Sequence, residues 1–263
     1  MFSKSLAITL LTYLTAITAS PVSTRQNGLQ VINNCYQSGQ VALTFDDGPY
    51  IYENDVVNSL NGGRGTFFLN GNNYVCIYDK VDEIRALSAQ GHTLGSHTWS
   101  HPDLTKLSED EINQGEFQPY FFLSISPQLT KVEQAFIRIL GLKPLYFRPP
   151  YGSYNDLVLN VLAQRGYKKV FLWSDDTGDA SGESPSYSEG VLESVANDYP
   201  KPHLVLDHSV IQTTSTEVLP NSVWKLQQAG YQLVAVDTCL GDDGEWPYEY
   251  VGEPGTPDGS WTC

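Results

Sequence analysis

Strand-like and helix-like segments alternate along most of this chain, and this alternation constrains its fold more than any other feature. Seven runs rich in β-branched and aromatic residues are the strand candidates: 41–45, 65–70, 92–97, 145–148, 169–173, 203–208 and 232–236. Between several of them, apolar residues recur at helical spacing and the pattern ends at a glycine, as in 82–91, 132–141, 155–166 and 222–230. Such alternation is typical of a parallel sheet wrapped by helices. The number of units predicts an α/β barrel, complete or one unit short, with working residues placed after the strands.

Size and charge exclude several classes of protein. A length of 263 residues with 41% apolar content suits one globular domain. The net charge of −15 is spread along the chain and leaves no basic face, so we expect no nucleic-acid partner. Beyond the N-terminal region, no stretch is long and apolar enough to cross a membrane.

Residues 1–20 have the pattern of a secretory signal peptide. Lys4 precedes an apolar run, 6–17, and Ala19 or Ser20 offers a small residue for cleavage. The run is short and interrupted by threonines, which argues against a spanning helix, and an N-terminal anchor is the alternative. We therefore expect secretion to the extracellular space or the cell wall, with no membrane attachment once the signal is removed.

The chain has four cysteines, Cys35, Cys76, Cys239 and Cys263, which suits an oxidising compartment. None lies in a Cys-x-x-Cys pattern typical of a metal or redox site, so we interpret them as two disulfides. The residues alone leave all three pairings open.

Two segments depart from the alternating pattern. Residues 115–128 interrupt what is otherwise one helical pattern, with prolines and an aromatic cluster that do not suit a helix. They are either a surface loop or translated intron sequence in a mispredicted gene. Residues 243–263 form an acidic tail rich in glycine and proline, which we expect to be loose except where Cys263 holds it.

Two adjacent carboxylates, Asp46 and Asp47, end the first strand candidate and precede a glycine that permits unusual backbone dihedrals. The pair is useful if a divalent cation neutralises one carboxylate while the other stays nearby as a base. His97 and His101 are spaced to lie on one side of a helical turn, a geometry common in metal chelation. The alternatives are a solvated Asx-turn for the acids and structural or surface positions for the histidines.

Three further strand ends carry reactive groups. Arg148 can orient a carboxylate there, or form an ordinary surface salt bridge. The segment 172–180 is rich in aspartate. Leu206 and His208 share one side of the strand candidate that they end. An imidazole whose pKa a neighbouring aspartate raises suits a general acid, and the alternative is a hydrogen-bonded barrel-end histidine.

Together the motifs resemble the polysaccharide deacetylases with a NodB homology domain, carbohydrate esterase family 4, and fungal chitin deacetylases in particular. Five motifs match in order: TFDDGP at 44–49, HTWSH at 97–101, RPPY at 148–151, DTGD at 176–179 and LDH at 206–208. The resemblance implies a single catalytic domain over 35–242, folded as a distorted (β/α) barrel of seven or eight units. Residues 21–34 are then an N-terminal extension.

The resemblance also implies a role for each matching residue. The metal ligands are Asp47, His97 and His101, and the metal is usually zinc, replaceable by cobalt or another divalent cation. The catalytic groups are Asp46 as base, Arg148 as the residue that orients it, His208 as acid, and Asp179 as the aspartate that tunes the acid. The substrate contacts are Pro150, the backbone N–H of Tyr151, and Leu206 against the acetyl methyl group.

The implied reaction is hydrolysis of N-acetyl groups on N-acetylglucosamine units of chitin or chito-oligosaccharides, giving acetate and chitosan, by a protein that we expect to be a monomer. Acetylxylan and peptidoglycan are alternative substrates, since Ala180 stands where the family often has an aromatic residue that walls the acetyl pocket. Other classes left open are a glycoside hydrolase using Asp46 or Asp47 and a non-catalytic secreted chitin-binding protein. Because the family often ties its domain ends together, the resemblance implies the disulfide Cys35–Cys239, which leaves Cys76–Cys263.

Overall fold

The computed structural model describes residues 24–26, 28–113 and 128–263, so the predicted signal peptide and residues 115–127 lie outside the described residues. The strands are β1 (Thr24–Gln26), β2 (Leu29–Ile32), β3 (Gln40–Asp46), β4 (Thr66–Leu69), β5 (Thr93–Ser96), β6 (Leu142–Pro144), β7 (Tyr146–Phe147), β8 (Lys169–Phe171), β9 (Asp175–Asp176), β10 (His203–His208), β11 (Gln232–Leu233) and β12 (Tyr248–Tyr250). The α-helices are α1 (Glu53–Ser59), α2 (Val81–Ala89), α3 (Glu109–Asn113), α4 (Gln128–Leu140), α5 (Asp156–Gln164), α6 (Pro185–Asn197), α7 (Leu219–Ala229) and α8 (Val236–Cys239).

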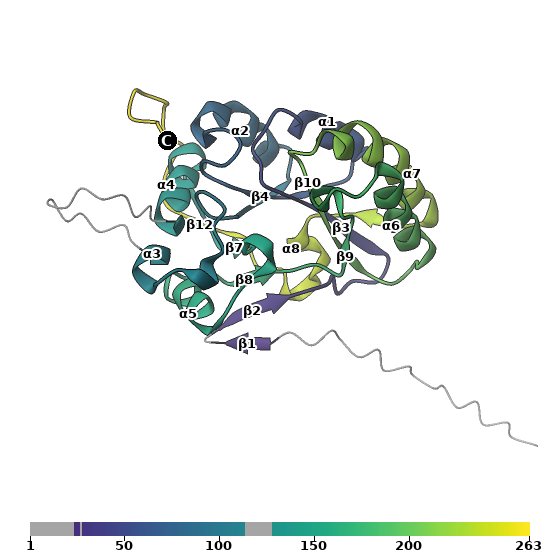
Figure 1. Ribbon diagram of the computed structural model, residues 1–263, viewed down its shortest axis with the longest axis horizontal. Helices are drawn as coiled ribbons and strands as arrows, with labels where there is room; N and C mark the ends of the chain where they lie inside the picture. The colour runs from purple at the N-terminus through teal and green to yellow at the C-terminus, as the bar shows by residue number, and fades with distance from the viewer. Residues whose placement is uncertain (1–23, 27, 114–127) are drawn as a thin grey trace, which may run out of the picture.

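Most strands form one curled sheet in the order β1-β2-β8-β7-β5-β4-β3-β10-β9, with β11 also paired to β3. Only the β1–β2 pair of this sheet is antiparallel, and all other pairs are parallel. Parallel strands require crossover connections, which carry the chain back to the end of the sheet where the preceding strand began. Figure 1 shows α1, α6 and α7 together on one side of the curled sheet and α2 and α4 on another. The predicted α/β barrel is confirmed, as a curled, incompletely paired one.

The segment between β8 and β9 bridges the gap in the barrel wall, where no pair of strands is hydrogen-bonded. β8 and β9 follow each other in sequence but lie near opposite ends of the strand order. Between them, Leu172 N donates to Ile32 O at 2.7 Å, and Ser174 N donates to Leu204 O at 2.9 Å. These crossing residues complete the barrel wall beside its mouth.

Side-chain alternation along β3 explains how polar groups reach the barrel interior. Leu43 and Phe45 pack in the apolar layer between sheet and helices, whereas Ala42 packs in the core inside the barrel. By the same alternation Thr44 and Asp46 face inward. Apolar side chains therefore fill the barrel toward the amino ends of the strands, and inward-facing polar groups gather at the carboxyl ends.

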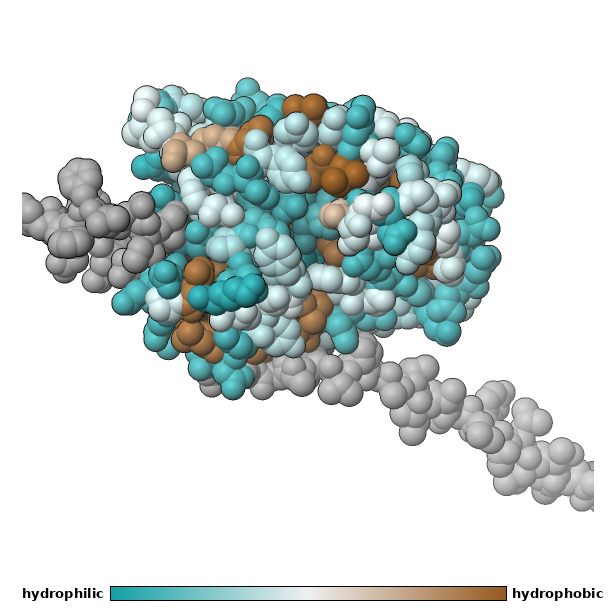
Figure 2. Space-filling model, viewed as in Figure 1, coloured by the Kyte–Doolittle hydropathy of each residue, from teal (hydrophilic) through white to brown (hydrophobic). Residues whose placement is uncertain are grey.

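The face of the molecule that carries the mouth of the barrel shows little continuous apolar area in Figure 2. Figure 2 shows the apolar side chains of the viewed face in small, separate patches among hydrophilic ones. Within the described ranges, no helix combines the length and the apolar character needed to span a membrane.

One expectation about a strand boundary was wrong. The strand predicted over 232–236 ends at Leu233, and α8 begins at Val236, whose backbone N donates to Thr66 Oγ1. The segment 21–34, predicted as an N-terminal extension, contributes β2, which pairs in parallel with β8.

The acidic C-terminal tail is held to the rest of the domain at several points, whereas its composition predicted a loose segment held only at Cys263. Its strand β12 pairs antiparallel with β6, and the Trp261 ring lies 5.4 Å from that of Tyr78. Arg85 Nη2 donates to Gly255 O at 2.6 Å. The structure pairs the cysteines as the resemblance implied, Cys35 with Cys239 and Cys76 with Cys263.

Replacing Cys76 and Cys263 together by serine tests what the second disulfide contributes. The pair closes a loop with a sequence separation of 187, so its loss should lower the free energy of unfolding by about 2–5 kcal/mol. Urea denaturation measures this change, and limited proteolysis should cut the tail earlier than in the unchanged protein. An unaltered midpoint and cleavage pattern would show that β12 and Trp261 hold the tail without the disulfide.

Candidate active site

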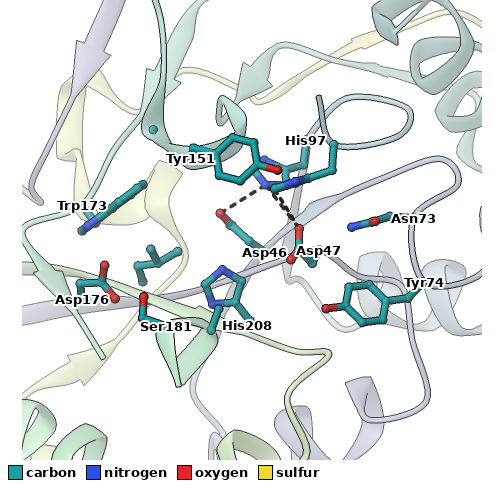
Figure 3. A pocket seen from close by; sticks show the side chains of 14 residues that line it. Asp46, Asp47, Asn73, Tyr74, His97, Tyr151, Trp173, Asp176, Ser181 and His208 are labelled. Carbon is teal, nitrogen blue, oxygen red and sulfur yellow. Dashed lines mark ion pairs between the residues drawn. The ribbon is translucent and has the colours of Figure 1, made fainter. Parts of the chain in front are cut away.

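A cavity of about 630 Å³ opens at the carboxyl end of the strands. Seven of the residues predicted to form the site line it: Asp46, Asp47, His97, His101, Tyr151, Leu206 and His208. Figure 3 shows the carboxylate pair at the centre of this cavity, with the imidazole of His97 on one side and that of His208 on the other. Parallel strands end at the same edge, which is why motifs distant in sequence meet here.

Asp47, His97 and His101 form a group that can hold a metal ion. Asp47 Oδ1 lies 3.3 Å from His101 Nε2 and 3.6 Å from His97 Nε2, and the three ligand atoms lie within 4.8 Å of one another. Ligands about 2.0–2.1 Å from a tetrahedral metal ion lie about 3.4 Å apart, so these distances fit a single ion.

The chemistry of these atoms also fits a metal. Asp47 Oδ1 is buried and has no hydrogen-bond partner among the described residues. His97 Nδ1 donates to Arg148 O at 2.7 Å, which leaves Nε2 of the neutral ring free to act as a ligand. Burial lowers the pKa of both His97 and His101 and so favours the neutral imidazole that metal binding requires.

The two histidines meet through left-handed turns and not through a helix. The helical turn expected for 97–101 was wrong, since this segment is irregular, with φ of 74° at Thr98 and 58° at His101. His101 N donates to Thr98 Oγ1, which closes the turn. Asn70 Nδ2 donates to the carbonyl oxygens of His97 and Thr98. Asn70 N also donates to Gly48 O, so one asparagine links the two turns that carry the candidate ligands.

Arg148 holds Asp46 beside this group. The guanidinium is fully buried, and its Nη1 donates to Asp46 Oδ1 at 2.8 Å and to Thr44 Oγ1 at 2.7 Å. The other carboxylate oxygen, Asp46 Oδ2, lies 3.6 Å from His97 Nε2. A charge-assisted bond of this kind fixes the orientation of a carboxylate, so the other oxygen of Asp46 faces the candidate metal-binding group.

His208 is paired with Asp179 across the cavity. Its Nδ1 donates to Asp179 Oδ1 at 2.7 Å, and its backbone N donates to Oδ2 of the same carboxylate at 2.8 Å. Burial by itself disfavours the imidazolium, but the hydrogen bond and charge of Asp179 outweigh it and raise the pKa of His208 to about 9. Burial likewise works against ionisation of Asp179, and its bonds with His208 and Thr214 reverse the effect and lower its pKa. His208 is therefore protonated at neutral pH, as a general acid must be.

The rim of the cavity differs in part from the prediction. Pro150 is buried and is not among the described residues that line the cavity, whereas Tyr151 is 68% exposed and has a φ of 60°. Ala180 lines the cavity, where the family often has an aromatic residue. Other lining residues that no assigned role covered are Asn73, Tyr74, Gly152, Trp173, Asp176 and Ser181. Asp176 and Gly152 lie in or beside the motifs quoted above. For the other four residues, the only indication in the sequence was their position near the end of a predicted strand or in the loop that follows it.

The His208–Asp179 pair makes a testable pH prediction for the metal-free protein. NMR titration should give His208 a pKa near 9, and Asp179→Asn should bring it to or below 6.5, its usual value. Because the pKa is raised in the folded state, the stability that the pair contributes is fully present below about pH 6.5 and is lost as pH rises through about 9. An unchanged His208 titration in the Asp179→Asn variant would contradict the pairing.

Comparison with known proteins agrees with this geometry. A family model described as polysaccharide deacetylase matches residues 33–118 and 123–170. A chitin deacetylase of Pestalotiopsis sp. is 35% identical over 237 residues, which cover 86% of this chain and 73% of that protein. The structure of the chitin deacetylase from the fungal pathogen Colletotrichum lindemuthianum has a TM-score of 0.73 and 34% identity, covering 84% of this chain and 95% of that chain. A peptidoglycan-N-acetylglucosamine deacetylase of Bacillus cereus is 32% identical over 66% of this chain and 57% of that protein. This chain belongs to the polysaccharide deacetylase family.

Proposed function

We propose that this protein is a secreted, monomeric, zinc-dependent deacetylase that hydrolyses the N-acetyl groups of N-acetylglucosamine units in chitin or chito-oligosaccharides. The observation that carries the proposal is the placement of Asp47, His97 and His101 around one point, between the Arg148–Asp46 ion pair and His208. The two disulfides and the signal-like pattern of residues 1–20 support secretion.

Two imidazoles and a carboxylate with an open position are a ligand set typical of catalytic zinc. When bound, zinc polarises a carbonyl group and lowers the pKa of water to about 7. Asp46, which Arg148 orients, takes one proton from the attacking water. His208 gives its Nε2 proton to the departing amine, because its Nδ1 is already bonded to Asp179. Each positioned acid or base contributes about 10²–10⁴-fold in rate.

The backbone N–H of Tyr151 is our proposed donor to the oxyanion that forms when water attacks the amide. The left-handed conformation of this residue is strained for a tyrosine, and such strain concentrates where a backbone group has to be aimed. The side chain of Leu206 offers an apolar surface to the acetyl methyl group.

The shape of the cavity supports a polymeric substrate. Tyr151 and Tyr74, which are 68% and 50% exposed, lie on opposite sides of the carboxylate pair in Figure 3. Flat rings at both ends of an open cleft suit the apolar faces of consecutive sugar units. Chitin is favoured over peptidoglycan because the relatives named chitin deacetylase share more sequence with this chain.

A glycoside hydrolase that uses Asp46 or Asp47 with another carboxylate is disfavoured by the contacts of these two side chains. Such enzymes need one carboxyl group that protonates the leaving oxygen and another that acts across the scissile bond. Here Asp46 is bonded to the buried guanidinium of Arg148, and Asp47 Oδ1 faces the imidazoles of His97 and His101, so both carboxylates are held within the candidate metal site.

Acetate release tests both the reaction and the substrate. Chitin oligomers should release acetate without new reducing ends, and acetylxylan and peptidoglycan should be poorer substrates. A chelator should abolish the activity and added zinc should restore it. Activity that ignores the chelator would refute the metal dependence, and binding without turnover would favour a chitin-binding protein.

Two substitutions separate metal binding from proton transfer. Asp46→Asn should keep zinc but lose about 10²–10⁴-fold in kcat, because only the base is removed. His97→Ala should lose both zinc and activity. Metal content by elemental analysis and kcat on chitin oligomers measure the two effects. Near-normal turnover by the Asp46→Asn variant would show that Asp46 is not the base.

A further inference from the structure

Glu53 stands in the first turn of α1, is 2% exposed, and takes no part in the reaction proposed above. Its Oε1 accepts a hydrogen bond from Tyr50 N at 2.6 Å and another from Ser209 Oγ at 3.1 Å. Tyr50 belongs to the turn that follows Asp47, and Ser209 directly follows His208. One buried oxygen atom therefore links the turn that carries a metal-binding carboxylate to the end of the strand that carries the acid.

The turn fits closely against this oxygen. A Cβ atom at Gly48 would lie 2.7 Å from Glu53 Oε1 and 2.9 Å from Ser209 Oγ, closer than side-chain carbons approach other atoms. The carbonyl oxygen of Gly48 is held as well, by Asn70 N at 2.7 Å. The turn is thus confined between the end of β4 and the Glu53–Ser209 bond.

We propose that Glu53 is a positioning residue whose Oε1 sets the place of Asp47 relative to the two metal-binding histidines and to His208. The inference rests on the proposed metal-dependent function and extends it to a residue that touches neither metal nor substrate. Asp47 has a φ of 70°, a conformation that a non-glycine residue keeps only when its surroundings enforce it. Without Oε1, the Tyr50 N–H and the Ser209 hydroxyl lose their acceptor, and the turn is free to relax.

The two hydrogen bonds to Glu53 require an acceptor atom at Oε1 but no negative charge on the side chain. Glu53 Oε2 is buried and has no hydrogen-bond partner among the described residues. Burial also raises the pKa of Glu53, which disfavours the charged form. A glutamine carbonyl can accept the same two hydrogen bonds. Glu53→Gln should therefore preserve the position of the turn, whereas Glu53→Ala should release it.

Zinc affinity tests the proposal without relying on turnover. Competition with a chromophoric chelator should show zinc binding weakened about 10–100-fold in Glu53→Ala, the usual effect of removing a group that supports a metal ligand. Ser209→Ala should weaken it less, because the Tyr50 bond remains. Glu53→Gln should bind zinc like the unchanged protein, and kcat on chitin oligomers should fall in the same order.

Val56→Ala is the matched control, because it removes buried apolar atoms from the same helix without touching the turn. It should lower Tm and leave zinc affinity unchanged. A Glu53→Ala variant that loses Tm but binds zinc normally would overturn the proposal, as would a Glu53→Gln variant as weak as Glu53→Ala. An unchanged protein that binds no zinc would instead overturn the proposed function, and this inference with it.

Discussion

The mouth of the barrel depends on a guanidinium that has no contact with water. Arg148 is 0% exposed, and a buried charge is tolerated only when it is paired and its donors are satisfied. Asp46 supplies the opposite charge, Thr44 Oγ1 and the carbonyl oxygen of Leu172 accept hydrogen bonds from the guanidinium, and the ring of Phe68 lies 4.4 Å away. Removal of one partner from such a pair typically costs about 3–5 kcal/mol. The contact that orients Asp46 is therefore also one that holds β3 against the loop after β7 and the crossing between β8 and β9.

Backbone strain is concentrated around the same site. Among the described residues other than glycine, those with a positive φ are Asp47, Asn61, Thr98, His101 and Tyr151, and all but Asn61 belong to the loops that form the cavity. Such conformations cost energy and persist only where neighbours enforce them. Asn70 on one side and the Glu53–Ser209 bond on the other contact the segments that carry Asp47 and Thr98. The strands thus place the loops at the mouth of the barrel, and buried polar side chains fix the conformation of those loops.

Sequence reasoning singled out residues that the structure brings together at one cavity, but it did not single out Asn70 or Glu53 beside them. Alternating segments predicted the parallel barrel, and strand-end motifs located Asp47, His208 and their partners, because each motif contains its own chemical signal. Asn70 carries no such signal, and neither does the bond of Glu53 to Ser209, since these partners are close in space but distant in sequence. The tail was expected to be loose from its composition, but contacts with distant residues such as Tyr78 decided its order. The spacing of His97 and His101 also wrongly predicted a helical turn over 97–101, where the structure has residues in the left-handed conformation.

The carbonyl oxygen of Arg148 receives the Nδ1 proton of His97, while its side chain orients Asp46. Every amino acid carries that carbonyl, but only arginine carries the guanidinium. Exchange of this residue would therefore remove the group that orients Asp46 and leave the backbone bond that orients His97, at a cost in stability. If the proposed function holds, such a variant would keep its metal site and its sugar-binding cavity but lose its oriented base, and a single substitution would turn an enzyme into a carbohydrate-binding protein.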